Sequence, residues 1–361
     1  MTTEQRLHLA IRTAQRSHAS VISLEGEGKA VPASFPQVVA GLASLPLKIL
    51  QVSDFTDLIT AIRCLTLMYF SQSPGLKSLI LTKGNCTQLV ELKTGLDQLP
   101  ELETLNLSEV ALGRTGISGL IPYLQIRQLR YLNLSACRLE DEGLVALAQC
   151  FQGALAVLQT LVLSFNQITS LGMSGLQAAI IDSRVYLENL DLSYNNLEDA
   201  GLLTLLRIAR SLPLLHSLQI SRCNVKAYGI RQLANFLMNN AHLKELNLAD
   251  NLHCGDWLEC VAKPLLEALH RNSSLRVLVL SVPQHHLAQA RDLFTAVTST
   301  ELNIKYELIK LTYRPCSFAT LNGNKEVLCV IFECLWGTRR PRKCILLPVL
   351  THCEKVCNCT H

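Results

Sequence analysis

The segments Leu158–Asn166 (LQTLVLSFN) and Leu187–Asn195 (LENLDLSYN) repeat one pattern, in which leucines alternate with other residues and an asparagine follows. The pattern continues in both directions along the chain. Its first apolar position falls at residues 19, 47, 76, 102, 129, 158, 187, 215, 243 and 275, so successive units begin 26 to 32 residues apart. Ten units with one period predict a repeat architecture.

A second element recurs in phase with the first: a glycine, an aliphatic residue and a leucine three positions further on, as in Gly143 to Leu147. The first element alternates with the period of two of a short strand, whereas the second has the three-and-four spacing of a helix. Acidic residues such as Asp141 and Asp199 precede these leucines and suit the positive end of a helix dipole. Because neither element can bury its apolar face alone, stacked units are expected to form an α/β solenoid with a parallel sheet backed by helices.

At this point the sequence resembles the leucine-rich repeat family, in its long-unit subclass typified by ribonuclease inhibitor. The family places Asn or Cys at the ninth position of the unit, and five of six units agree. The residues there are Val110, Cys137, Asn166, Asn195, Cys223 and Asn251. The resemblance implies a horseshoe of about ten units, with a concave parallel sheet and convex helices.

Three domains are expected from this reading: an N-terminal capping helix over residues 1–18, the solenoid over 19–313, and a poorly ordered Cys-rich tail over 314–361. Seven of the 14 cysteines fall after residue 314. Three interpretations of the tail stay open: a solvated segment with a basic cluster, a zinc site near its end, or an alternative C-terminus. The chain could also be a fragment of a larger protein.

Composition narrows the class of protein. With 49% apolar and 17% charged residues the chain is expected to fold around a large core, and its net charge of +4 indicates no particular partner. The first twenty residues lack the apolar segment of a signal peptide, and no apolar stretch is long enough to span a bilayer. We therefore expect an intracellular protein of the cytoplasm or nucleus that does not enter a membrane.

Motifs of catalysis are missing from the sequence. The run Gly26–Lys29 lacks the spacing of a phosphate-binding loop, and His285 with His286 has no nucleophile or carboxylate at a diagnostic distance. His253, Cys254 and Cys260 do not have zinc-ligand spacing. We therefore expect no enzyme activity, no catalytic residue, no cofactor and no metal.

The residues between the strand leucines are expected to face the concave side. They are mostly small and polar, and only Glu25, Asp191 and Glu245 among them are ionisable. A groove without Lys or Arg makes nucleic acid an unlikely ligand there. Tyr131, Asp191 and Glu245 are the candidate partner-binding residues of this face.

One position past each strand, three neighbouring units carry Phe165, Tyr194 and Arg222. Parallel strands lie about 5 Å apart, so these side chains are expected to lie together on an exposed rim. Aromatic residues and Arg dominate interface energies, which makes them candidate protein-binding residues, although aromatics are also ordinary at this position of the family.

The function expected from these observations is that of a non-enzymatic scaffold or adaptor. It would bind a protein partner through the concave face or the rim, as a monomer or as part of a hetero-complex. Ran GTPase-activating proteins have a similar solenoid, so the alternative is a regulator of a small GTPase. The acidic run that usually follows the repeats in that family is missing here.

Overall fold

One continuous parallel sheet organises the chain. The computed structural model describes residues 2–84, 89–152, 154–181, 185–251, 256–283, 286, 290 and 303–309. Within these residues eleven strands pair in sequence order, each with its chain neighbours. They are β1 (Val21–Lys29), β2 (Ile49–Phe55), β3 (Ser78–Thr82), β4 (Thr104–Asn106), β5 (Tyr131–Asn133), β6 (Thr160–Val162), β7 (Asn189–Asp191), β8 (Ser217–Gln219), β9 (Glu245–Asn247), β10 (Val277–Pro283) and β11 (Asn303–Ile309).

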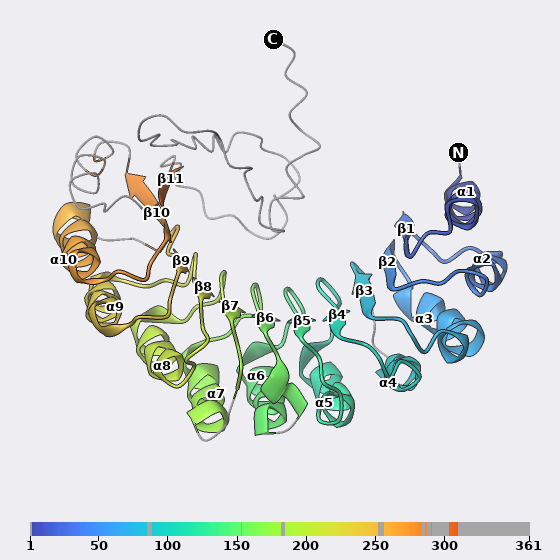
Figure 1. Ribbon diagram of the computed structural model, residues 1–361, viewed down its shortest axis with the longest axis horizontal. Helices are drawn as coiled ribbons and strands as arrows, with labels where there is room; N and C mark the ends of the chain where they lie inside the picture. Colours follow the sequence, from blue (N-terminus) through green and yellow to red (C-terminus); the bar gives the residue numbers. More distant parts are fainter. Residues whose placement is uncertain are drawn as a thin grey trace, which may run out of the picture. The chain divides into compact units, whose positions relative to one another are not determined.

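Helices connect the strands and cover one face of the sheet. From α1 to α10 they lie along the outer side of an arc whose inner side carries the strands (Figure 1). The helices are α1 (Thr3–Ser17), α2 (Phe35–Leu42), α3 (Leu58–Met68), α4 (Leu89–Asp97), α5 (Gly113–Leu124), α6 (Glu140–Ala148), α7 (Ser170–Ile181), α8 (Glu198–Arg210), α9 (Ala227–Asn239) and α10 (Lys263–Arg271). The predicted α/β solenoid is thereby confirmed.

The N-terminal end of the solenoid begins with α1. A capping box between Thr2 and Gln5 starts this helix, and its Leu7 and Ile11 side chains are buried. The domain boundaries proposed from the sequence stay predictions, and the tail of residues 314–361 lies outside the described residues.

The sheet register places one leucine at the centre of each short strand. Leu161, Leu190 and Leu218 are partners in consecutive strands, and each is at most 1% exposed. The residues on either side of Leu190, Asn189 and Asp191, are half-buried on the concave face. Burying a leucine contributes about 1.5 to 3 kcal/mol, so this repeated column is a main source of stability.

Buried asparagines join each turn to the unit before it. The Asn195 Oδ1 atom accepts hydrogen bonds from the backbone N–H groups of Asn166 and Ile168, at 2.9 and 3.0 Å. The Asn195 Nδ2 atom donates to the carbonyl oxygens of Leu163 and Leu192, at 2.9 and 2.8 Å. Equivalent bonds to the preceding unit are made by Asn166 and Asn251. Asn suits the ninth position of these three units because an amide can satisfy buried donors and acceptors together.

Two aspartates make a second connection, which runs to the following unit. Asp141 and Asp199 lie in the first turns of their own helices, as predicted from the sequence. Their carboxylates also reach forward: Asp141 accepts from the Thr169 backbone N–H at 2.7 Å and from its hydroxyl at 2.6 Å. Asp199 accepts from the Lys226 backbone N–H at 2.7 Å. Each carboxylate thus serves the N-terminus of the next helix as well.

We expect Gly172→Ala to destabilise the solenoid, because Gly172 packs directly against Asp141. A Cβ atom at Gly172 would lie 2.5 Å from Asp141 Oδ1 and 3.1 Å from Asp141 Cα, so the backbone or the Thr169 bonds must shift. The expected cost is about 1 to 3 kcal/mol. The measurement is a chemical-denaturation midpoint.

Gly175→Ala, in the same helix, is the control for that variant. A Cβ atom at Gly175 would meet only the half-exposed side chain of Val145, which can move. The gain in helix propensity of about 1 kcal/mol should offset this contact. Equal losses of stability in the two variants would contradict the close approach to Asp141.

Candidate functional site

The turn residue that follows each strand has the same unusual backbone in six consecutive units. We call this set the rim row, and its φ angles lie between 51° and 61°. A non-glycine residue pays about 1 to 2 kcal/mol for this left-handed conformation, which the tight turn requires. The repeated geometry fixes the rim row as a line along one edge of the sheet. Its members are Glu109, Ala136, Phe165, Tyr194, Arg222 and Asp250.

Three of the predicted partner-binding residues come together in the rim row. The rings of Phe165 and Tyr194 stack with centroids 3.8 Å apart and an interplanar angle of 17°. The guanidinium of Arg222 lies 5.2 Å from the Tyr194 ring centroid, and its Nε is 2.7 Å from Asp250 Oδ2. Phe165 and Tyr194 remain 40% and 39% exposed. The result is one continuous exposed strip of stacked groups.

The other three predicted residues do not form such a cluster. Tyr131, Asp191 and Glu245 begin or end β5, β7 and β9, so another strand separates each from the next. Burial raises the pKa of Tyr131 and that of Asp191. Asp191 accepts a hydrogen bond from the Ser193 backbone N–H at 2.9 Å, which gives its carboxylate a local structural role.

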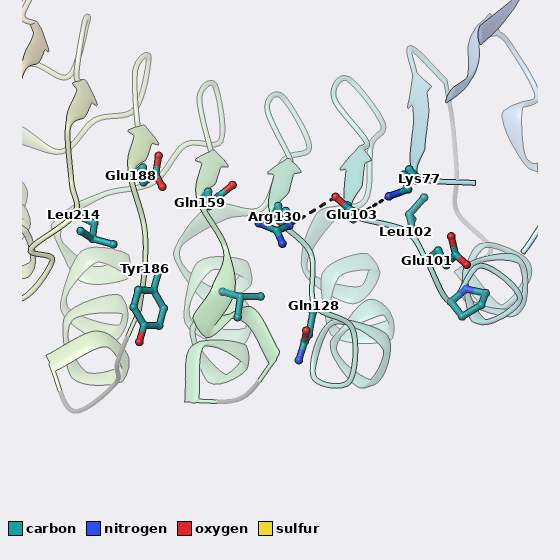
Figure 2. A pocket seen from close by; sticks show the side chains of 12 residues that line it. Lys77, Glu101, Leu102, Glu103, Gln128, Arg130, Gln159, Tyr186, Glu188 and Leu214 are labelled. Atoms are coloured by element: carbon teal, nitrogen blue, oxygen red, sulfur yellow. Dashed lines mark hydrogen bonds and ion pairs between the residues drawn. The ribbon is translucent and has the colours of Figure 1, made fainter. Parts of the chain in front are cut away.

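A groove at the opposite edge of the sheet was not predicted from the sequence. It has a volume of about 610 Å³ and lies where the chain enters β3 to β7 (Figure 2). The exposed side chains of Tyr186 and Leu214 line it together with several charged residues. The full lining consists of Lys77, Pro100, Glu101, Leu102, Glu103, Gln128, Arg130, Val157, Gln159, Tyr186, Glu188 and Leu214.

Three of the charged residues that line this groove form ion pairs with one another. Figure 2 shows Glu103 between Lys77 and Arg130, with Lys77 Nζ at 3.0 Å from Glu103 Oε1 and Arg130 Nε at 3.6 Å from Oε2. The hydrogen bond from Lys77 holds the pKa of Glu103 below its usual value. Lys77, Glu103 and Arg130 occupy the second position of consecutive units, where positive and negative residues alternate. This alternation of charge in the sequence could have indicated the groove.

Other candidate sites can be placed only in part. The described part of the chain contains no group of three or more His, Cys, Asp or Glu residues that could hold a metal ion. His253 and Cys254 lie outside it, as do the His and Cys residues of the tail. His286 stacks on Trp257 with ring centroids 6.3 Å apart. None of the helices in the described residues is sufficiently long and apolar to cross a membrane.

Known proteins with a similar repeat match the central units. The family described as Leucine Rich repeat matches residues 126–148, 155–176, 185–206 and 239–251. Among solved structures, an internalin from Listeria monocytogenes is 16% identical, with a TM-score of 0.45, and the match covers 84% of this chain and 89% of that chain.

Proteins of two kinds are among the curated relatives that the chain matches. NACHT, LRR and PYD domains-containing protein 13 of Homo sapiens is 29% identical over 210 residues, which is 58% of this chain and 20% of the relative. Ribonuclease inhibitor of Sus scrofa is 30% identical over 232 residues, 54% of this chain and 50% of the inhibitor. The chain thus spans about a fifth of the first relative and half of the second. Its repeat, its parallel sheet and the family match to the central units show a leucine-rich repeat architecture, and the chain is similar to proteins of the ribonuclease-inhibitor-like type.

Proposed function

We propose that this protein is a non-enzymatic scaffold or adaptor that binds a protein partner through the rim row. The observation that carries the proposal is the strip formed by Phe165, Tyr194 and Arg222, in which stacked aromatic rings and a guanidinium lie exposed side by side. Stacking between units orders these side chains before any partner arrives. A pre-ordered aromatic surface loses little conformational entropy on binding, which favours affinity.

The concave face is the second part of the proposed surface. Tyr131, Asp191 and Glu245 lie in strands whose following turns carry members of the rim row, and they would supply polar contacts to the same partner. One relative is named as an inhibitor of another protein, a ribonuclease, and this supports a protein as the ligand class. We propose an intracellular location and a monomer or a hetero-complex as the working form.

The alternative function, regulation of a small GTPase, has no observation in its favour within the described residues. Arg222, the rim arginine, is already held by Tyr194 and Asp250. Stimulation of GTP hydrolysis in a panel of small GTPases by micromolar protein would be required to revive this alternative.

A crosslinking pulldown tests the proposed function. The variant Phe165→Ala, Tyr194→Ala, Arg222→Ala should lose a partner that the unchanged protein captures, and for the purified partner the affinity should fall by at least tenfold. Truncating each well-packed interface residue costs about 1 kcal/mol or more, which gives this magnitude. The measurement is quantitative mass spectrometry of the captured proteins, followed by titration of the purified partner.

The matched control removes three residues at the opposite edge of the sheet: Gln159→Ala, Tyr186→Ala, Leu214→Ala. These residues line the groove and not the rim row, so the control should retain the partner. Loss of the partner in the control but not in the rim variant would move the binding surface to the groove. Equal capture by all three proteins would overturn a binding role for the rim row.

A further inference from the structure

Ala136 has the smallest side chain of the rim row, and it leaves a gap between its two neighbours in the row. Ala136 lies between Glu109 on one side and Phe165 on the other, and all three share the left-handed turn backbone. In order along the row the residues are acid, alanine, aromatic, aromatic, arginine and acid. The second half, Tyr194, Arg222 and Asp250, is complete and has the order aromatic, arginine, acid. The first half has the reverse order but carries Ala136 in place of the arginine, and we call it incomplete.

The complete half shows what an arginine does at this position. Arg222 stacks over the Tyr194 ring, with its guanidinium carbon 5.2 Å from the centroid. The same guanidinium pairs with the carboxylate of Asp250 in the next unit, at 2.7 Å. A planar cation thus fits between an aromatic ring and an acid that are two units apart.

The incomplete half has the same two kinds of group, an acid and an aromatic ring, with only Ala136 between them in the rim row. One face of Phe165 is covered by Tyr194, so its other face is directed toward the Ala136 side of the row. Two strand spacings, about 10 Å, separate Glu109 from Phe165 along the row, which is enough for one planar group between them. Within the described residues, no hydrogen bond or ion pair is formed by the exposed Glu109 carboxylate.

We propose that an arginine side chain of a protein partner occupies this gap, with its guanidinium stacked on Phe165 and paired with Glu109. The inference rests on the proposed function of the rim row and names the chemistry of the partner. Arginine fits better than lysine because its planar, weakly hydrated cation can stack on a ring and pair with a carboxylate at once.

The turn of the unit before Glu109 and the turn of Ala136 each carry one cation of this chain. Lys83 has the same turn backbone in the unit that precedes the six members of the rim row, and Arg138 follows Ala136 by two residues. The positive charges of Lys83 and Arg138 lower the affinity of the gap for an arginine and would raise its affinity for an anion. Arg138→Gln is therefore expected to increase the affinity for arginine. A decrease in affinity would be expected if the ligand of the gap were an anion.

The test uses N-acetyl-arginine methylamide as the probe, with backbone amide NMR shifts of the full chain at constant ionic strength. A single residue binds weakly, so the readout is the initial slope of the shift against probe concentration at Glu109, Ala136 and Phe165. The arginine probe should give at least three times the slope of its lysine analogue. The citrulline analogue, which has the same shape without charge, should give almost none.

Variants assign the binding to the gap. Glu109→Gln should reduce the arginine slope at least threefold, whereas Asp54→Asn, an acid with the same turn backbone elsewhere in the protein, should leave it unchanged. Ala136→Arg should abolish the response at Phe165, and Ala136→Ser should preserve it. Equal slopes for arginine and citrulline, or a slope unaffected by Glu109→Gln, would overturn the proposal.

The outcome is independent of the pulldown. If the rim variant loses its partner but the arginine probe does not bind, the rim row binds proteins through other chemistry and the arginine proposal fails. If the probe binds as expected while the rim variant keeps every partner, the gap is a cation site and the proposed scaffold function of the rim row fails.

Discussion

Leu190→Asp is expected to unfold the central units of the solenoid. Leu190 is 1% exposed and lies between Leu161 and Leu218 in the leucine column of the sheet. Loss of a buried leucine side chain costs about 2 to 5 kcal/mol, and the buried carboxylate adds its own desolvation cost. Because a domain is stable by only about 5 to 15 kcal/mol, the melting temperature should fall sharply in a circular-dichroism or calorimetric scan.

Asp191→Asn is the control for this variant, one residue further along the same strand. Asp191 accepts a hydrogen bond from the Ser193 backbone, and asparagine makes the same bond at the equivalent positions Asn106, Asn133 and Asn247. Burial also raises the pKa of Asp191, so the site does not favour the charge that is removed. The change in stability should stay within about 0.5 kcal/mol. Identical melting curves for the two variants would contradict the strand register.

Asn195→Ala should cost about 3 kcal/mol or more. The Asn195 side chain is only 2% exposed, and its amide joins two N–H groups of the preceding unit to buried carbonyl oxygens. Each buried polar group left without a partner costs about 1 to 3 kcal/mol. Equilibrium unfolding in urea measures the loss.

The neighbouring asparagine provides a matched control. Asn196 is exposed and bonds only with other surface side chains, so Asn196→Ala should cost less than about 0.5 kcal/mol. Asn195→Cys should fall between the two, because Cys137 and Cys223 occupy the same position in other units and donate their thiols to carbonyl oxygens. A loss for Asn195→Ala no larger than that for Asn196→Ala would show that the buried amide bonds do not matter.

The fold could be predicted because the residues that determine it recur with a fixed period in the sequence. Alternating leucines and the glycine-leucine element determine strand and helix separately, and the unit length leaves room for one of each. The rim row was predictable for the same reason, since a residue with the same place in each unit must lie beside its counterparts. Counting positions within each unit was enough to predict that Phe165, Tyr194 and Arg222 lie side by side.

Other features depend on side-chain geometry that counting does not provide. The forward bond of Asp141 to Thr169 requires a carboxylate to span two units, whereas the sequence indicated only its place near a helix dipole. The groove at the strand starts is lined by the long side chains of Lys77 and Arg130, and their ion pairs with Glu103 are set by side-chain conformation. Residues at the variable positions of a repeat differ from unit to unit, so the alternating charges of Lys77, Glu103 and Arg130 indicate ion pairs but not the shape of the groove.

The bonds between units all have a direction. Asparagines such as Asn195 reach back to the preceding turn, and Asp141 reaches forward to the next helix, so these central units are completed by residues of their neighbours. In such a linear array, stability is approximately a sum of unit and nearest-neighbour terms. A gene duplication that copies a whole unit preserves each of these junctions, while an insertion of half a unit breaks two of them. Lengthening during evolution is therefore expected to proceed in whole multiples of about 28 residues, the spacing seen between most units of this chain.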